Sequence, residues 1–143
     1  MNILYFLTPK NDVAYLMDDF TVRQALEKME SCSYAALPML GKDGVYVGTV
    51  TEGDLLRYFK HEHFPSLREM QSRCVMEVPR CSDNVPIKVY TAMDELVATS
   101  LDQNFVPVTD DRGMFIGIVT RKSIIRYYFE KTEPREHPAG EAR

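Results

Sequence analysis

The chain has 143 residues, of which 45% are hydrophobic and 27% are charged, an ordinary balance for one globular unit or two very small ones. Its 17 basic and 21 acidic residues give a formal net charge of −4 at pH 7. This charge argues against a nucleic-acid partner, because a protein that binds nucleic acid usually carries a basic stripe. No apolar stretch approaches the roughly 18 residues of a membrane span, and the apolar start at residues 1–7 lacks a basic leader. We therefore expect no membrane partner.

The cysteine and histidine residues indicate neither a disulfide framework nor a metal site. Cys32, Cys74 and Cys81 are odd in number and form no Cys-x-x-Cys pair, which favours a reduced, cytoplasmic compartment. His61 and His63 are two residues apart, and ligands at that spacing do not share a helix face. We expect no metal ion and no obligatory cofactor.

In chain order, the first half of the sequence predicts a strand, a helix, two strands and a second helix. The extended run Val13–Leu16 comes first, and Thr21 then starts a helix with the capping-box pattern Thr-x-x-Gln. The apolar run 34–37 and the β-rich run 45–51 flank a turn that contains glycine, which is a hairpin signal. Apolar residues at helical spacing follow at 55–59.

The second half repeats this order. An extended run at 85–87 precedes a helix for which Thr91 is the expected N-cap. An apolar run at 104–106 and a β-rich run at 114–120 predict the second hairpin. Helical spacing returns at 124–128.

The two halves are a duplication. Residues 38–60 and 107–129 align without a gap at an offset of 69, and seven of the 23 positions are identical. We therefore predict an α+β fold of two βαββα repeats that pack with pseudo-twofold symmetry, since a unit of this size is marginal alone. The predicted parts are repeat 1 at residues 1–66, repeat 2 at 67–131, a link at Pro65–Glu69 and a disordered tail at 132–143.

Two motifs, each present in both halves, resemble those of a CBS-domain pair, also called a Bateman module. The first is an apolar residue before proline, at Leu37-Pro38 and Val106-Pro107. The second is Gly-apolar-apolar-Thr-x-x-Asp, at 48–54 and, with a departure, at 117–123. The resemblance covers about residues 5–131. It implies a regulatory binding module rather than an enzyme, one that takes an adenosine-containing ligand between its repeats and forms a homodimer.

The resemblance also implies site residues. In the family, the Thr and Asp of the second motif contact ribose and phosphate, which gives Thr51 and Asp54 in the first repeat and Thr120 and Ser123 in the second. A carboxylate can accept hydrogen bonds from both hydroxyls of a ribose, whereas a serine cannot grip both. We therefore expect unequal sites, with the Asp54 site closer to the family norm. The other ligand-contacting residues that the resemblance implies are Ala14, Tyr34, Ala35, Ala36, Leu37, Pro38, Phe105, Val106 and Pro107.

Arg121 and Lys122 follow Thr120 at a predicted strand-to-helix junction, where free backbone amides and the helix dipole suit a phosphate. Thr120-Arg121-Lys122 and other short segments resemble small stand-alone bacterial CBS proteins that bind cyclic di-AMP, in which two consecutive basic residues face the phosphates. Asp12 stands near where that group can carry a basic residue, and would repel such a ligand if it pointed inward. The ligand alternatives are cyclic di-AMP and the mononucleotides AMP, ADP and ATP, with S-adenosylmethionine as a further one.

These residues also have structural interpretations. Thr51 and Asp54 suit a helix cap, and Arg121 and Lys122 could be solvated surface charges. The functional prediction is a stand-alone module that reports ligand status in trans to an unidentified effector protein. The alternative is a ligand-free protein-interaction or dimerisation module with degraded nucleotide sites, which Ser123 would explain.

Overall fold

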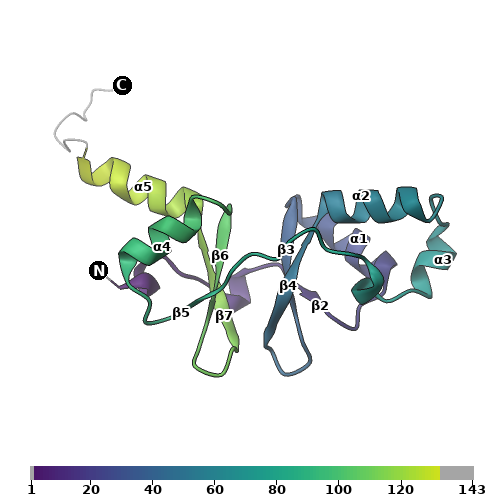
Figure 1. Ribbon diagram of the computed structural model, residues 1–143, viewed down its shortest axis with the longest axis horizontal. Coiled ribbons are helices and arrows are strands. Elements are labelled where there is room, and N and C mark those ends of the chain that lie inside the picture. The colour runs from purple at the N-terminus through teal and green to yellow at the C-terminus, as the bar shows by residue number, and fades with distance from the viewer. Residues whose placement is uncertain (1, 133–143) are drawn as a thin grey trace.

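The computed structural model describes residues 2–132 of the chain (Figure 1). Its elements follow the predicted order of strand, helix, two strands and helix in each half. They are η1 (Ile3–Phe6), β1 (Thr8–Pro9), η2 (Lys10–Asp12), β2 (Leu16–Met17), α1 (Val22–Cys32), β3 (Ala36–Leu40), β4 (Tyr46–Thr51), α2 (Glu52–His61), α3 (Leu67–Gln71), η3 (Val75–Glu77), β5 (Ile87–Lys88), α4 (Met93–Ser100), β6 (Phe105–Thr109), β7 (Phe115–Thr120) and α5 (Arg121–Thr132).

Two sheets stand side by side at the centre of the molecule, and the helices lie at its two ends (Figure 1). The strand order is β2-β3-β4 in the first sheet and β1-β7-β6-β5 in the second. Each sheet is built on an antiparallel hairpin, and a short parallel strand joins its first member. The hairpin pairs Ala36 with Thr51 in the first repeat and Phe105 with Thr120 in the second. These pairs differ by the offset of the sequence repeat, so the α+β prediction with two equivalent halves is confirmed.

The tips of the two hairpins hold the repeats together around the pseudo-twofold axis. The Tyr46 amide donates to the Gly113 carbonyl at 3.2 Å, and the Phe115 amide donates to the Gly44 carbonyl at 2.9 Å. The rings of Tyr46 and Phe115 stack at 6.5 Å between centroids. Gly44 and Gly113 have φ of 88° and 82°, a backbone region that favours glycine. Both turns therefore depend on a residue that the duplication kept.

Each repeat has its own apolar core, and the first residues of the chain belong to the second one. Ile3 and Phe6 are buried with residues of the second repeat, and the rings of Phe6 and Tyr127 meet edge to face at 5.1 Å. Strand β1 pairs with β7 at Thr8–Ile118. The first core contains Leu16, Val22, Ala25, Met29, Leu37, Met39, Val50, Leu55, Tyr58, Met70, Val75 and Val78, and the second contains Ile3, Phe6, Ile87, Leu96, Val106, Val108, Val119 and Ile124.

Of the two predicted N-caps, one is confirmed and one is wrong. Thr21 Oγ1 accepts from the Gln24 amide at 3.0 Å, and Gln24 Oε1 accepts from the Thr21 amide at 2.8 Å. The N-cap of α4 is instead Ala92, which makes no side-chain cap bond. The Thr91 hydroxyl is already used, because it accepts from the Lys88 amide at 3.1 Å across the turn that follows β5.

The structure also redraws the predicted connections. The link Pro65–Glu69 includes the first turn of α3, because Ser66 Oγ accepts from the Glu69 amide at 3.2 Å and caps that helix. Helix α5 extends through Thr132, where the predicted tail begins. Residues 133–143 of that tail lie outside the described residues.

Candidate functional site

A cavity of about 220 Å³ lies between the two repeats, and we call it the inter-repeat cavity. Its wall draws on the loop before β2, on the start of β3 and on the facing ends of β6 and β7. Most of the wall is apolar, with a few polar groups, which is the usual composition of a small-molecule site. The lining residues are Thr8, Asp12, Val13, Ala14, Tyr34, Ala35, Ala36, Leu37, Pro38, Asn104, Phe105, Ile118 and Thr120.

Local backbone geometry places the polar groups of this wall. Ser33 ends α1 in the left-handed region, at φ 59°, and the chain then presents Tyr34 with 59% of its surface exposed. Asn104 is held at the strand-to-helix corner of the second repeat, because its carbonyl accepts from the Arg121 amide at 2.9 Å. Thr120 is the last residue of β7, and its Oγ1 accepts from the Ser123 amide at 3.1 Å. The inter-repeat cavity therefore meets the N-terminal turn of α5.

The structure gathers eight of the fifteen predicted ligand-contacting residues at this cavity. The eight are Ala14, Tyr34, Ala35, Ala36, Leu37, Pro38, Phe105 and Thr120. The lining does not include Thr51, Asp54, Val106, Pro107, Arg121, Lys122 or Ser123.

Five lining residues were not among the predicted ligand-contacting residues: Thr8, Asp12, Val13, Asn104 and Ile118. Asn104 could have been found, because the offset of 69 makes it the counterpart of Ala35, a residue that the resemblance did mark. Ile118 is likewise the counterpart of Thr49, in the middle of the second motif. Thr8 gave no signal, since β1 has two residues and pairs with the other half of the chain.

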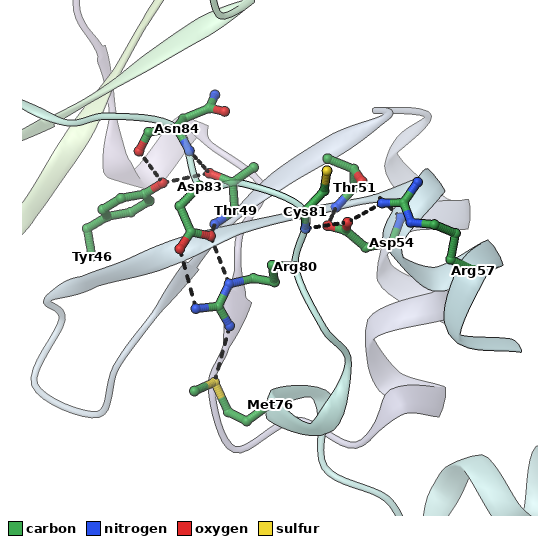
Figure 2. Close-up of polar contacts among 10 residues, drawn as sticks. All are labelled: Tyr46, Thr49, Thr51, Asp54, Arg57, Met76, Arg80, Cys81, Asp83 and Asn84. Atoms are coloured by element: carbon green, nitrogen blue, oxygen red, sulfur yellow. Dashed lines mark hydrogen bonds and ion pairs between the residues drawn. The ribbon is translucent and has the colours of Figure 1, made fainter. Parts of the chain in front are cut away.

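Asp54 is buried and lies outside the inter-repeat cavity, and its carboxylate is used within the chain (Figure 2). Oδ2 accepts from the Thr51 amide at 2.9 Å, and the Thr51 hydroxyl accepts in return from the Asp54 amide at 3.0 Å. Oδ1 accepts from Arg57 Nη2 at 2.7 Å and from the Cys81 amide at 3.0 Å. The hydrogen bonds between Thr51 and Asp54 are therefore those of a helix cap, and the Cys81 amide is a further donor to Asp54.

The basic pair of the second motif does not line the inter-repeat cavity either. Arg121 Nε donates to the Ser100 carbonyl at 2.8 Å and Nη2 donates to the Leu101 carbonyl at 3.5 Å. A cation at a helix C-terminus is favourable, so Arg121 serves the end of α4. Lys122 is exposed. Ser123 Oγ donates to the Thr120 carbonyl at 2.8 Å.

A partly buried polar network covers the first-repeat hairpin (Figure 2). The Tyr46 hydroxyl shares a hydrogen bond with Thr49 Oγ1 at 2.6 Å and donates to the Asn84 carbonyl at 2.8 Å. Burial raises the pKa of Tyr46 to about 12, and the nearby Asp83 carboxylate adds to the shift. The Thr49 amide donates to Asp83 Oδ1 at 2.8 Å, and Arg80 Nε donates to the same oxygen at 2.8 Å. Hydrogen bonds from Tyr46 and Thr49 therefore hold the loop 80–84 against β4.

Two wider features bear on the classes of function that were considered. Within residues 2–132, no group of three or more His, Cys, Asp and Glu side chains is placed to hold a metal ion. No described helix is both long enough and apolar enough to cross a membrane.

A duplicated βαββα unit with a cavity between its halves defines a two-repeat binding module. Residues 6–61 and 77–130 match the family model of the CBS domain, so the chain belongs to the CBS-domain family and carries a pair of these domains. CBS domains are binding modules rather than catalysts. The family assignment and the fold expected from the resemblance are both confirmed.

Solved structures share this fold, and one curated protein is related in sequence. The chain is similar to CbpB in complex with c-di-AMP, at 26% identity over 91% of this chain and 85% of that one, with a TM-score of 0.81. It is similar in fold to CBSX2 in complex with AMP, at 22% identity over 92% and 98%, with a TM-score of 0.71. A curated relative is the uncharacterized protein MJ1225 of Methanocaldococcus jannaschii, 25% identical over 81% of this chain. The chain spans 45% of that relative's length.

Proposed function

We propose that the chain is a regulatory module that binds an adenine nucleotide in the inter-repeat cavity. The observation that carries the proposal is that both repeats line this cavity. The first repeat contributes residues 34–38, and the second contributes Asn104, Phe105, Ile118 and Thr120. A ligand held there bridges the repeats. It can bias their arrangement only if it binds one arrangement more tightly than another.

The residue types of the wall suit the parts of such a ligand. The apolar segment Ala35–Pro38 and the Tyr34 ring offer a surface for a flat base. The Asn104 carboxamide can donate and accept hydrogen bonds. Thr120 adds a hydroxyl beside the N-terminal amides of α5, where the helix dipole favours a phosphate.

Among the ligands considered, we place cyclic di-AMP first and AMP second. Asp12, which was expected to repel cyclic di-AMP if it pointed inward, does line the described wall, and Arg121 is bound to the end of α4. This repulsion grows with the charge of the ligand, so the site disfavours the highly charged ADP and ATP most. Each phosphodiester of cyclic di-AMP carries one negative charge. The similarity to CbpB, solved with c-di-AMP, and to CBSX2, solved with AMP, supports this order.

Paired threonine variants test the proposal. Thr120→Val and Thr51→Val each remove one hydroxyl that caps a helix, at 3.1 Å and 3.0 Å from the N3 amide, but only Thr120 lines the cavity. Calorimetric titration of cyclic di-AMP and AMP should show affinity lowered at least about tenfold in Thr120→Val, the cost of one hydrogen bond to a charged group, and unchanged in Thr51→Val. Wild-type protein that binds none of the five adenosine ligands would instead favour the ligand-free interaction module.

The proposal includes a homodimer formed through the helical ends of the repeats. Leu56 on α2 and Ile125 on α5 occupy the same position in the two repeats, and 62% and 60% of their surfaces are exposed. Because a pseudo-twofold axis relates the repeats, a second copy can cover both residues at once. Light scattering after size exclusion should give a dimer for wild type and for the control Lys28→Glu, and a monomer for Leu56→Glu/Ile125→Glu. A wild-type monomer would contradict this part.

The remaining parts of the proposal concern output and location. The ligand state of the module would be read by an effector protein that recognises one arrangement of the repeats. The location would be the cytoplasm, in keeping with three cysteines that are all free.

A further inference from the structure

The repeat symmetry assigns the inter-repeat cavity a counterpart position on the opposite side of the pseudo-twofold axis, and we call this position the first-motif cleft. Its residues are the counterparts of the wall of the inter-repeat cavity. Gln103 is the counterpart of Tyr34 at the offset of 69. Val85 stands for Ala14, because β5 pairs with β6 at Ile87 where β2 pairs with β3 at Leu16. Thr51 stands for Thr120.

The Gln103 side chain fills the part of this cleft that faces Val85. Its Oε1 accepts from the Val85 amide at 2.8 Å, and its Nε2 donates to the Val85 carbonyl at 3.0 Å. An acceptor beside a donor is also what the edge of adenine presents with its N1 and its 6-amino group. The Gln103 carboxamide thus satisfies the backbone groups that a base would otherwise satisfy. The counterpart residue Tyr34 has a phenol ring and no carboxamide, so it cannot make the same pair of hydrogen bonds.

The loop 80–84 lies against β4, beside Thr49 (Figure 2). The Asp83 carboxylate accepts from the Thr49 amide and from Arg80, and so an anion of the chain itself lies on β4. It lies so close that a β-carbon on Gly48 would collide with it. The Cys81 amide and Arg57 both donate to Asp54 Oδ1, and the Thr51 amide donates to Oδ2. The Asp54 side chain has no exposed surface that a ribose could reach.

This packing also reaches the wall of the inter-repeat cavity. The Phe105 carbonyl accepts from Asn84 Nδ2 at 2.9 Å and from Gln103 Nε2 at 3.1 Å. Phe105 itself is one of the residues that line the inter-repeat cavity. The groups that fill one cleft therefore hold a wall of the other.

We propose that Gln103 and the loop 80–84 are a built-in occupant of the first-motif cleft, so that each chain binds one nucleotide and binds it in the inter-repeat cavity. Gln103 takes the place of the base, and Asp83 takes the place of the anionic part. The inference rests on the proposed function for the identity of the ligand. The filling of the first-motif cleft is itself independent of any ligand.

A matched pair of tryptophan variants tests this inference. Ala14→Trp puts an indole into the inter-repeat cavity, and Val85→Trp puts one at the counterpart position, where 59% of the Val85 surface is exposed. AMP, with a single adenine, is the probe for counting by calorimetry. Wild type and Val85→Trp should bind one AMP per chain, and Ala14→Trp should bind at least tenfold more weakly. Two AMP per wild-type chain, or a loss in Val85→Trp only, would overturn the inference.

A second measurement needs no ligand and remains decisive if a variant fails to fold or if no nucleotide binds. The side-chain NH₂ protons of Gln103, assigned by NMR with Gln103→Leu as the reference, should exchange with solvent at least tenfold more slowly than those of the exposed Gln71. Equal exchange rates would mean that the carboxamide is not held, and the built-in occupant would be wrong. Slow exchange without any AMP binding would count against the proposed function alone.

Discussion

Replacement of Asp54 by alanine should lower the stability of the protein and leave nucleotide binding intact. The carboxylate caps α2 and accepts from the amides of Thr51 and Cys81. The bond to the Thr51 amide is the Asp54 half of the capping box. Asp54→Ala leaves the Thr51 and Cys81 amides, both part-buried, without partners, at a cost of about 1 kcal/mol each. The Arg57 ion pair adds little, because 62% of that side chain is exposed. The free energy of unfolding should therefore fall by about 2 kcal/mol, which corresponds to a decrease of roughly 6 °C in Tm.

Urea unfolding of wild type and Asp54→Ala measures this difference, and calorimetric titration with AMP is run where both variants are folded. Ser123→Ala is the matched control at the counterpart position, where the side chain donates to the Thr120 carbonyl alone, and it should cost about 1 kcal/mol or less. The reasoning is refuted if Asp54→Ala keeps wild-type stability and loses its affinity for AMP, because the carboxylate would then serve the ligand.

Two other substitutions separate the architecture from the site. Tyr46→Phe should lower stability by about 1 to 2 kcal/mol at neutral pH, because it leaves buried hydrogen-bond partners unpaired. The raised pKa of about 12 further means that the Tyr46 hydroxyl contributes stability that is present below pH 10 and declines as the pH rises toward 12. Unfolding between pH 8 and 12 should show this alkaline decline in wild type and a weaker one in Tyr46→Phe; identical pH profiles would count against it. Arg121→Gln should weaken the C-terminal cap of α4 and cost up to about 1 kcal/mol, with AMP affinity within twofold of wild type; a tenfold loss of affinity would return Arg121 to the ligand.

The strands, turns and helices could be predicted, because each is set by residues that are close together in the sequence. Gly44 and Gly113 mark equivalent turns, and Thr21 marks a helix start whose partner Gln24 is three residues away. The predicted cap at Thr91 was wrong, because the Thr91 hydroxyl accepts from the Lys88 amide in a turn. No local pattern distinguishes that competition from a cap.

The site was harder to predict, since the same motif has different fates in the two repeats. Thr51-x-x-Asp54 matches the family pattern better than Thr120-x-x-Ser123, and yet the cavity lies at Thr120. The reason is a loop from elsewhere in the chain, which reaches Asp54 through Cys81 and β4 through Asp83. Contacts across such sequence distances have no signature in spacing or composition.

The central claim is that the nucleotide lies in the inter-repeat cavity, and a crystal structure of the protein grown with cyclic di-AMP tests it most directly. The account predicts ligand density against Tyr34, Asn104 and Thr120, with the Asp54–Cys81 hydrogen bond intact. Density in the first-motif cleft, with Gln103 displaced from Val85, would contradict it.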